Sequence, residues 1–254
     1  EFQVNTYIGS NQYTPSVTAL DDGGFVVAWR DDSGHDGGSS YDVRVQRYGA
    51  DGEQLESGEQ LVNTYTSGSQ YEPSVSGLSD GGFVVTWRDD SGHDGGSGAD
   101  IRGQIYDGSG AKVGGEFRIN DYKSSTQYDP SVTTLADGGF VVTWSSNSQD
   151  GSSYGIYGQR FDDSGTADGD EFRVNTYTSG SQNDSSVTAL ADGGFVVTWT
   201  DHSGHDGGSS WDIRAQVYDA SGEMVGDEYL VNAYTGSTQS QPAVAAFDDG
   251  GFVV

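Results

Sequence analysis

Short apolar runs separated by turns rich in glycine and aspartate recur along the whole chain. The run GFVVAWR at 24–30 places Phe25 and Trp29 on one face of an extended strand and Val26 and Ala28 on the other, because successive side chains of a strand point to opposite faces. Both faces are therefore apolar. This pattern predicts a strand whose sheet is covered on both sides by neighbouring structure.

The pattern returns with a period of 55 to 58 residues, which the motif GGFVV marks. The motif begins at Gly23, Gly81, Gly138, Gly193 and Gly250. Each copy divides into four strand-like segments, which in the first copy span 15–20, 24–30, 41–48 and 59–65. The first and last connections are short and contain glycine, as hairpin turns with positive φ require. We therefore expect one four-stranded antiparallel sheet per repeat.

Sheets that bury both faces must stack on one another, and the small side chains of PSVTAL suit a first strand crowded near a central axis. We predict an all-β fold, a β-propeller or propeller-like stacked array of four-stranded antiparallel blades, with one blade per repeat. An open array or separate sandwiches are the alternatives.

We expect a single repeat domain over 1–254. Its predicted parts are a lone outer strand at 1–14, four repeats at 15–72, 73–129, 130–184 and 185–241, and a partial fifth repeat at 242–254. Because the chain opens in a fourth strand and stops within a second, we expect the native polypeptide to continue.

Acidic residues dominate the charge of the chain. Thirty-nine Asp and Glu stand against 11 Lys and Arg, for a formal net charge of −28. Such a chain is not expected to bind nucleic acid through its phosphates, and its self-repulsion predicts stabilisation by bound cations or by high ionic strength. The sequence has no cysteine, so disulfides cannot stabilise the fold, and it shows no run predicted to insert in a membrane.

Amide side chains recur at three positions of the repeat. They are Gln46, Gln104, Gln159 and Gln216 in the third strand, Asn5, Asn63, Asn120, Asn175 and Asn232 in the fourth, and Gln12, Gln70, Gln127, Gln182 and Gln239 before the first. We expect them to satisfy backbone groups between blades or to cap loops, with ligand contact as the alternative.

The long link between the second and third strands is an acidic loop, DDSGHDGGSS at 31–40, which recurs at 89–98 and 201–210. Carboxylate oxygens on a backbone rich in glycine favour Ca²⁺, which takes six to eight oxygen ligands at roughly 2.3–2.6 Å. The candidate ligands are Asp31, Asp32, Asp36, Asp89, Asp90, Asp94, Asp150, Asp201 and Asp206. Asp and Gly also build turns without any ion, so a purely structural loop is the alternative.

One histidine stands at the same place in three of these loops, as His35, His93 and His205. Zn²⁺ sites need further His or Cys ligands at defined spacing. We therefore interpret these histidines as packing or hydrogen-bonding residues.

The segments DGGFVVTW at 192–199, YGQRFDDSG at 157–165 and EFRVNTYTSGSQ at 171–182 carry a family resemblance. They resemble the Asp/Gly-rich repeats of large secreted bacterial proteins that often also carry hemolysin-type (RTX) calcium repeats and type I secretion signals. The resemblance covers essentially the whole chain and implies an extracellular, adhesin-like cell-surface or biofilm protein. The RTX calcium nonapeptide itself matches poorly, because GGSGAD at 95–100 is not iterated every nine residues.

A second, weaker resemblance is to the Asp-box of sialidase-type propellers, a turn between the third and fourth strands of a blade. YDASG at 218–222 and FDDSG at 161–165 lie at the corresponding turns. It supports the order of strands within the blade and implies no sialidase activity.

Because an active site needs only one constellation, near-identical copies favour a non-catalytic role. We expect a structural or adhesive scaffold, with itself or cell-surface glycans as partners. The alternative is a calcium-dependent glycan-binding propeller that uses the loop aromatics Tyr41, Tyr154 and Trp211.

Overall fold

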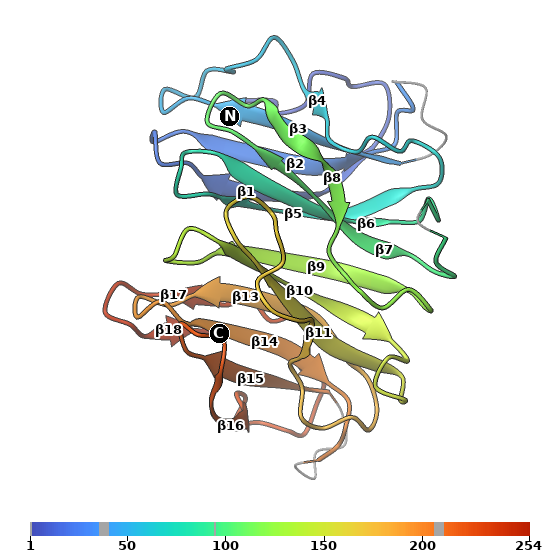
Figure 1. Cartoon of the computed structure of the whole chain (residues 1–254), viewed down its shortest axis with the longest axis vertical. Helices are drawn as coiled ribbons and strands as arrows, with labels where there is room; N and C mark the ends of the chain where they lie inside the picture. Colours follow the sequence, from blue (N-terminus) through green and yellow to red (C-terminus); the bar gives the residue numbers. More distant parts are fainter. Residues whose placement is uncertain (1, 36–40, 94, 206–210) are drawn as a thin grey trace. The chain divides into compact units, whose positions relative to one another are not determined.

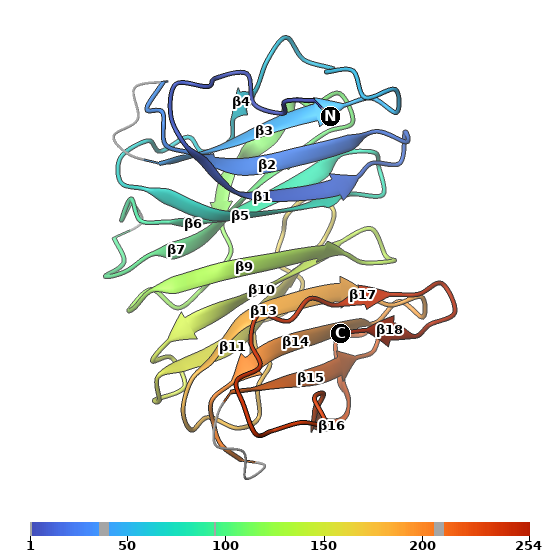
Figure 2. The same ribbon diagram turned by 180° about the vertical axis from the view of Figure 1, so that it is seen from behind.

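The computed structural model describes residues 2–35, 41–93, 95–205 and 211–254 (Figure 1). The chain divides into two compact units, Glu1–Ser124 and Ser125–Val254, and each is described by itself. Within the described residues, regular structure consists of β-strands (Figures 1 and 2). No helix there is long and apolar enough to cross a membrane.

The first unit holds two four-stranded antiparallel sheets, each following the order of the sequence. Their strands are β1 (Gln12–Ala19), β2 (Phe25–Asp31), β3 (Asp42–Tyr48) and β4 (Gln60–Leu61), then β5 (Gln70–Gly77), β6 (Phe83–Asp89), β7 (Asp100–Tyr106) and β8 (Lys112–Arg118).

The second unit repeats this plan and adds a two-stranded sheet. Its strands are β9 (Gln127–Thr134), β10 (Phe140–Asn147), β11 (Tyr154–Phe161), β12 (Phe172–Arg173), β13 (Gln182–Ala189), β14 (Phe195–Asp201), β15 (Asp212–Tyr218), β16 (Met224–Leu230), β17 (Ala245–Ala246) and β18 (Phe252–Val253). The prediction of one four-stranded antiparallel sheet per repeat is confirmed.

The apolar core of each unit lies between consecutive sheets. In the first unit Val26, Ala28 and Val45 of one sheet pack in the same cluster as Phe83 and Trp87 of the next. Burying each large apolar side chain contributes roughly 1.5–3 kcal/mol. The two apolar faces predicted for the second strand are therefore both used, since Val27 and Trp29 belong to a separate cluster.

Both glycines of the hairpin turn between the first and second strands are required by geometry. Gly23 has φ of +82°, a conformation that costs an L side chain about 1 kcal/mol or more. A Cβ on Gly24 would lie 2.3 Å from the Tyr48 carbonyl oxygen. The repeated DGG motif thus places the second strand against the third.

Two predicted boundaries are wrong. The first strand begins at Gln12, not at Pro15, because a bulge with positive φ at Thr14 lets the strand continue through the proline. The segment predicted as a lone outer strand forms no strand over residues 2–11. Its counterparts β4 and β12 pair with β3 and β11.

The fourth strand is also shorter than predicted in the first and third repeats, where it has two residues. The Asn63 side chain accounts for the end of this strand at Leu61, because Asn63 Oδ1 accepts the Val43 backbone N–H at 2.8 Å in place of a ladder hydrogen bond. Asn120 makes the equivalent bond beside the seven-residue β8, so this bond does not decide where the strand begins.

Candidate functional site

A buried arginine connects the second, third and fourth strands in three of the repeats. Arg44 is two residues into β3, and its Nε donates to Asp31 Oδ2 at the end of β2, at 2.9 Å. The same arginine lies 3.6 Å from Glu59 Oε1, just before β4. All three side chains are at most 7% exposed.

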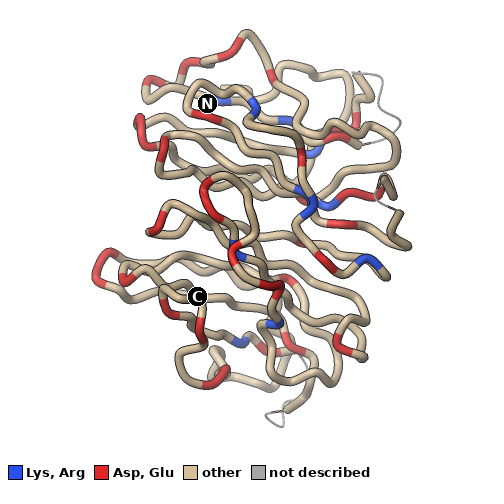
Figure 3. Tube along the Cα trace, in the orientation of Figure 1, with Lys and Arg blue, Asp and Glu red and all other residues tan. Residues whose placement is uncertain are grey.

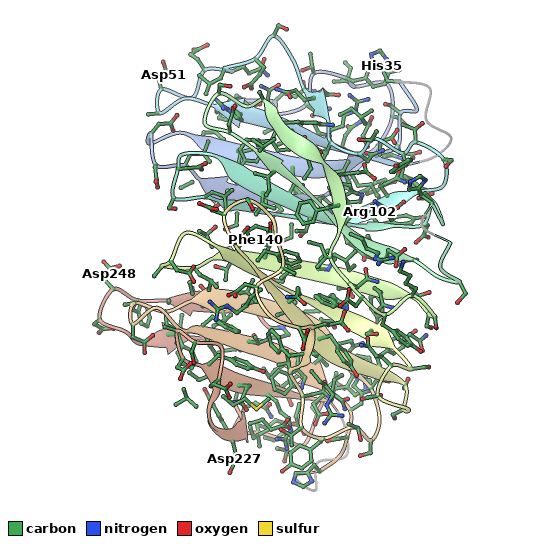
Figure 4. All side chains as sticks on the ribbon, in the orientation of Figure 1. His35, Asp51, Arg102, Phe140, Asp227 and Asp248 are labelled. Atoms are coloured by element: carbon green, nitrogen blue, oxygen red, sulfur yellow. The ribbon has the colours of Figure 1, made fainter. Side chains whose placement is uncertain are left out.

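The arrangement is repeated with nearly the same geometry. Arg102 lies 2.7 Å from Asp89 and 3.3 Å from Glu116. Arg214 lies 3.0 Å from Asp201 and 3.2 Å from Glu228. We call each Asp–Arg–Glu set a clasp. Figure 4 shows Arg102 inside its unit, and Figure 3 shows acidic residues mainly in the turns and loops.

The carboxylate of the leading aspartate in each of the three acidic loops accepts hydrogen bonds from protein donors. Asp31 Oδ1 accepts Gln12 Nε2 at 3.1 Å and the Ser33 backbone N–H at 3.2 Å, and its Oδ2 accepts the Ser33 hydroxyl as well as Arg44. Burial alone would raise the pKa of Asp31, but these hydrogen bonds and the Arg44 charge hold it below its ordinary value. This carboxylate therefore anchors the loop in its ionised form.

The equivalent carboxylates have the same partners. Asp89 accepts Gln70 Nε2 at 3.0 Å and the Ser91 N–H at 2.8 Å, and Asp201 accepts Gln182 Nε2 at 2.9 Å and the Ser203 N–H at 3.1 Å. Three of the nine predicted calcium ligands, Asp31, Asp89 and Asp201, are thus placed in clasps.

The remaining predicted ligands are dispersed. Asp90 forms a surface pair with Arg88 at 2.9 Å, and Asp32 is half-buried. Asp36, Asp94 and Asp206 lie outside the described residues. Among the residues that are described, no three His, Cys, Asp or Glu side chains gather in a metal-binding group. Calcium binding by these loops stays a prediction.

Asp150 shows how the third repeat differs. Its carboxylate lies over Gly155, where Oδ2 is 2.9 Å from the position of an added Cβ. The other repeats have an aspartate at the position of Gly155, namely Asp42, Asp100 and Asp212. The third repeat also has Ser146 and Tyr157 where the others have the aspartate and arginine of the clasp.

The recurring asparagines and third-strand glutamines bond backbone groups of their own repeat, whereas the glutamines at the start of the first strand donate to the leading loop aspartates. Asn63 Nδ2 donates to Asp42 Oδ1 at 2.8 Å and to the Tyr65 carbonyl at 3.0 Å, while Gln104 Nε2 donates to the Ile105 carbonyl at 3.0 Å. The role of these asparagines and third-strand glutamines as partners of backbone groups is confirmed.

The loop histidines stack on tyrosines of the preceding fourth-strand segment, as expected for packing residues. The ring centroids are 4.7 Å apart for Tyr7 and His35, 3.4 Å for Tyr65 and His93, and 3.6 Å for Tyr177 and His205. The guanidinium of Arg102 lies 5.3 Å from the Tyr65 ring centroid, and that of Arg214 lies 4.7 Å from Tyr177. Loop, clasp and preceding segment therefore meet at one place.

Sequence reasoning missed the clasp glutamates and these tyrosines. Each glutamate accepts a backbone N–H from the segment before its repeat: Thr6 N lies 2.8 Å from Glu59 Oε2, and Thr64 N lies 2.5 Å from Glu116 Oε2. The available signal was their fixed spacing, since Glu stands four residues before the recurring Asn and Tyr two residues after it.

A second missed feature is a pair of carboxyl groups in the second unit. Asp129 and Asp184 occupy the bulges of β9 and β13, with φ of 52° and 56°, and their side chains are hydrogen-bonded to each other. Burial raises the pKa of Asp184, although Thr200 Oγ1 at 3.5 Å opposes this.

No known family model matches the chain, and no curated protein matches it either. Several solved structures are similar to this chain. An α-L-arabinanase of Penicillium chrysogenum complexed with arabinobiose has a TM-score of 0.61 at 16% identity, covering 94% of this chain and 70% of its own. An α-L-arabinofuranosidase of Fusarium graminearum has a TM-score of 0.63 at 11% identity, covering 91% and 70%.

An endo-arabinase of Bacteroides thetaiotaomicron has a TM-score of 0.52 at 14% identity, covering 94% of this chain and 86% of its own. At these identities the similarity shows the fold alone. The chain thus has an all-β fold of four-stranded antiparallel sheets, which it shares with β-propeller glycoside hydrolases.

Proposed function

We propose that this chain is a non-catalytic, extracellular structural and adhesive repeat scaffold of a bacterial surface protein, stabilised by Ca²⁺ in its acidic loops. The observation that supports it most directly is the clasp. Three repeats commit the same buried Asp, Arg and Glu to holding strands and preceding segments together. Because these side chains pair with one another in the interior, we expect them to stabilise the array.

The proposal that Ca²⁺ binds these loops rests on two features of the sequence. Further aspartates lie in the loops outside the clasps, and the chain has a net charge of −28. The test is calorimetric melting of the chain in millimolar CaCl₂ and in EDTA, with MgCl₂ as the control ion. We expect chelation to lower the melting temperature by several degrees. An unchanged melting temperature would oppose structural calcium.

Assembly is the second part of the proposal, because near-identical repeats offer the same surfaces many times. Sedimentation velocity with and without calcium tests it. We expect species larger than a monomer in calcium, and a monomer at every calcium concentration would contradict self-assembly.

The second candidate function is carbohydrate binding. It is favoured by the fold shared with an arabinanase whose structure holds arabinobiose, and by the aromatic side chains beside the loops. A glycan array read with and without calcium separates the two candidates, because calcium-dependent hits would favour the lectin-like function.

Absence of catalysis is also testable. We expect no release of reducing ends from arabinan. If release occurs, Asp129→Asn and Asp184→Asn are the variants to examine, since these carboxyl groups lie together in the second unit.

A further inference from the structure

A buried hydrogen-bond donor and a buried acceptor recur without partners in the interior of two repeats. They are Trp87 Nε1 and Gln104 Oε1 in the second repeat, and Trp199 Nε1 and Gln216 Oε1 in the fourth. All four residues are 0% exposed, and none of the four atoms has a hydrogen-bond partner among the described residues. Burying a polar group without a partner is unfavourable, so each of these atoms needs an explanation.

The donor and the acceptor of a repeat project from the same face of their sheet. Trp87 of β6 lies opposite Arg102 of β7, and Gln104 is two residues further along β7. The two side chains are therefore diagonal neighbours, which are about 7–8 Å apart on an antiparallel pair and within reach of each other when they are long. The fourth sheet has the same register at Trp199 and Gln216.

The orientation of the glutamine amide is fixed by the bonds that its nitrogen makes. Gln104 Nε2 donates to the Ile105 carbonyl at 3.0 Å and to the Val113 carbonyl at 3.2 Å. Gln216 Nε2 makes the equivalent two bonds at 2.9 and 3.3 Å. Because turning the amide over would place its oxygen against two carbonyl oxygens, Oε1 stays on the other side, where it needs a donor.

A water molecule satisfies both groups at once. The indole N–H only donates and the amide Oε1 only accepts, yet neither repeat forms a direct bond between them. Water accepts from the first and donates to the second. A buried water typically makes about three hydrogen bonds. The hydroxyl of Tyr106 or Tyr218 can supply the third, since it projects from the same face two residues after the glutamine and also lacks a partner among the described residues.

The first repeat has the same two groups in a different setting. Trp29 Nε1 and Gln46 Oε1 also lack partners among the described residues, but Trp29 lines a cavity of about 360 Å³ together with residues 2–5. This volume is far larger than the roughly 30 Å³ that one water occupies in the liquid. A site for a single water therefore follows only for the second and fourth repeats.

We propose that the second and the fourth repeat each bind one ordered water molecule, which accepts a hydrogen bond from the tryptophan Nε1–H and donates one to the glutamine Oε1. Trp87 packs in one cluster with Val26 and Val45 of the first sheet, and Trp199 packs with Val141 of the third. The water therefore lies where two consecutive sheets meet. This site is independent of the calcium, assembly and carbohydrate proposals.

Water contacts at the indole N–H groups test the proposal directly. The experiment is water-selective NOESY and ROESY on the full chain labelled with ¹⁵N-tryptophan, with the five indole resonances assigned from single Trp→Phe variants. We expect cross-peaks from water to the Nε1–H of Trp87 and Trp199 with opposite signs in the two spectra, as a long-lived bound water gives. Equal signs would show proton exchange instead and would contradict the proposal. Trp211, which is 39% exposed, is the control for short-lived surface hydration.

Two glutamine variants form a matched pair. Gln104→Met removes the acceptor at nearly constant volume, so the Trp87 cross-peak should weaken at least fivefold while that of Trp199 stays unchanged. Gln216→Met should have the reverse effect. The two glutamines belong to different units, so each variant is the control for the other, and one of them suffices if the other does not fold.

Tyr106→Phe excludes a second source of the signal, because a tyrosine hydroxyl proton that exchanges with solvent also gives a cross-peak to a nearby N–H. The Trp87 cross-peak should persist in this variant, with circular dichroism confirming the fold. The proposal is overturned if neither Trp87 nor Trp199 contacts water, if the folded glutamine variants leave the cross-peaks unchanged, or if Tyr106→Phe abolishes the Trp87 cross-peak.

Discussion

Replacing Arg102 by tyrosine should destabilise the second repeat by about 3–5 kcal/mol, because it removes the cation between two buried carboxylates. Arg102 lies 2.7 Å from Asp89 and 3.3 Å from Glu116, and none of the three side chains is more than 4% exposed. The new ring is not expected to clash, since Tyr157 occupies the equivalent position in the third repeat. The cost is therefore electrostatic.

The matched control is Arg88→Gln in the neighbouring strand. Arg88 pairs with Asp90 at 2.9 Å, but the two side chains are 25% and 32% exposed, so this loss should be below about 1 kcal/mol. Because the chain has two compact units, a single unfolding transition is not assumed. Native-state hydrogen exchange of the β6 and β7 amides measures the local loss.

A second substitution distinguishes the charge effect from a packing effect. Adding Asp89→Ser to Arg102→Tyr copies Ser146 and Tyr157 of the third repeat. The double variant should regain at least half of the loss, because one buried carboxylate is then removed. Equal losses for Arg102→Tyr and the Arg88 control, or a further loss in the double variant, would refute the reasoning.

Two other predictions concern the glycine at Gly103 and the buried carboxyl group of Asp184. Gly103→Val should destabilise the fold by about 1–3 kcal/mol, because an added Cβ lies 2.9 Å from Phe117 Cζ. Phe117→Gln should relieve part of this loss in a double-mutant cycle, and additive losses would contradict the prediction. Burial raises the pKa of Asp184 above 3.8, so its protonated carboxyl stabilises the fold at low pH and this contribution is lost as pH rises through the raised pKa. Thermal melts should therefore find Asp184→Asn more stable than the native chain at pH 7 and equal to it below pH 3.8; a less stable variant at pH 7 would contradict this.

Much of the fold could be predicted because its signals are local. The paired glycines of the DGG turn, the alternation of GFVVAWR and the length of the period each depend on a few adjacent residues. The second strand was expected at 24–30 and is found at Phe25–Asp31, and the third was expected at 41–48 and is found at Asp42–Tyr48.

The site was less predictable because its partners meet only through strand register. Asp31 and Arg44 are 13 residues apart and are joined because β2 and β3 place Asp31 opposite Asp42, two residues from the arginine. The sequence of the loop by itself predicts only an exposed acidic turn. The end of β4 at Leu61 is equally non-local, since it depends on the bond between the Asn63 side chain and the Val43 backbone N–H.

The sequence does hold a signal for the clasp, in the way the repeats vary. Where the third repeat loses the aspartate at the end of the second strand it also loses the arginine of the third, with Ser146 and Tyr157 in their places. Loss of both together is expected if each charge is tolerated in the core only beside the other. The third repeat keeps the clasp glutamate as Glu171, but there its carboxylate accepts a hydrogen bond from Gln149 Nε2. The acidic loops therefore carry two kinds of carboxylate. The leading aspartate belongs to the interior of the sheet, whereas Asp90 beyond it forms a surface pair with Arg88.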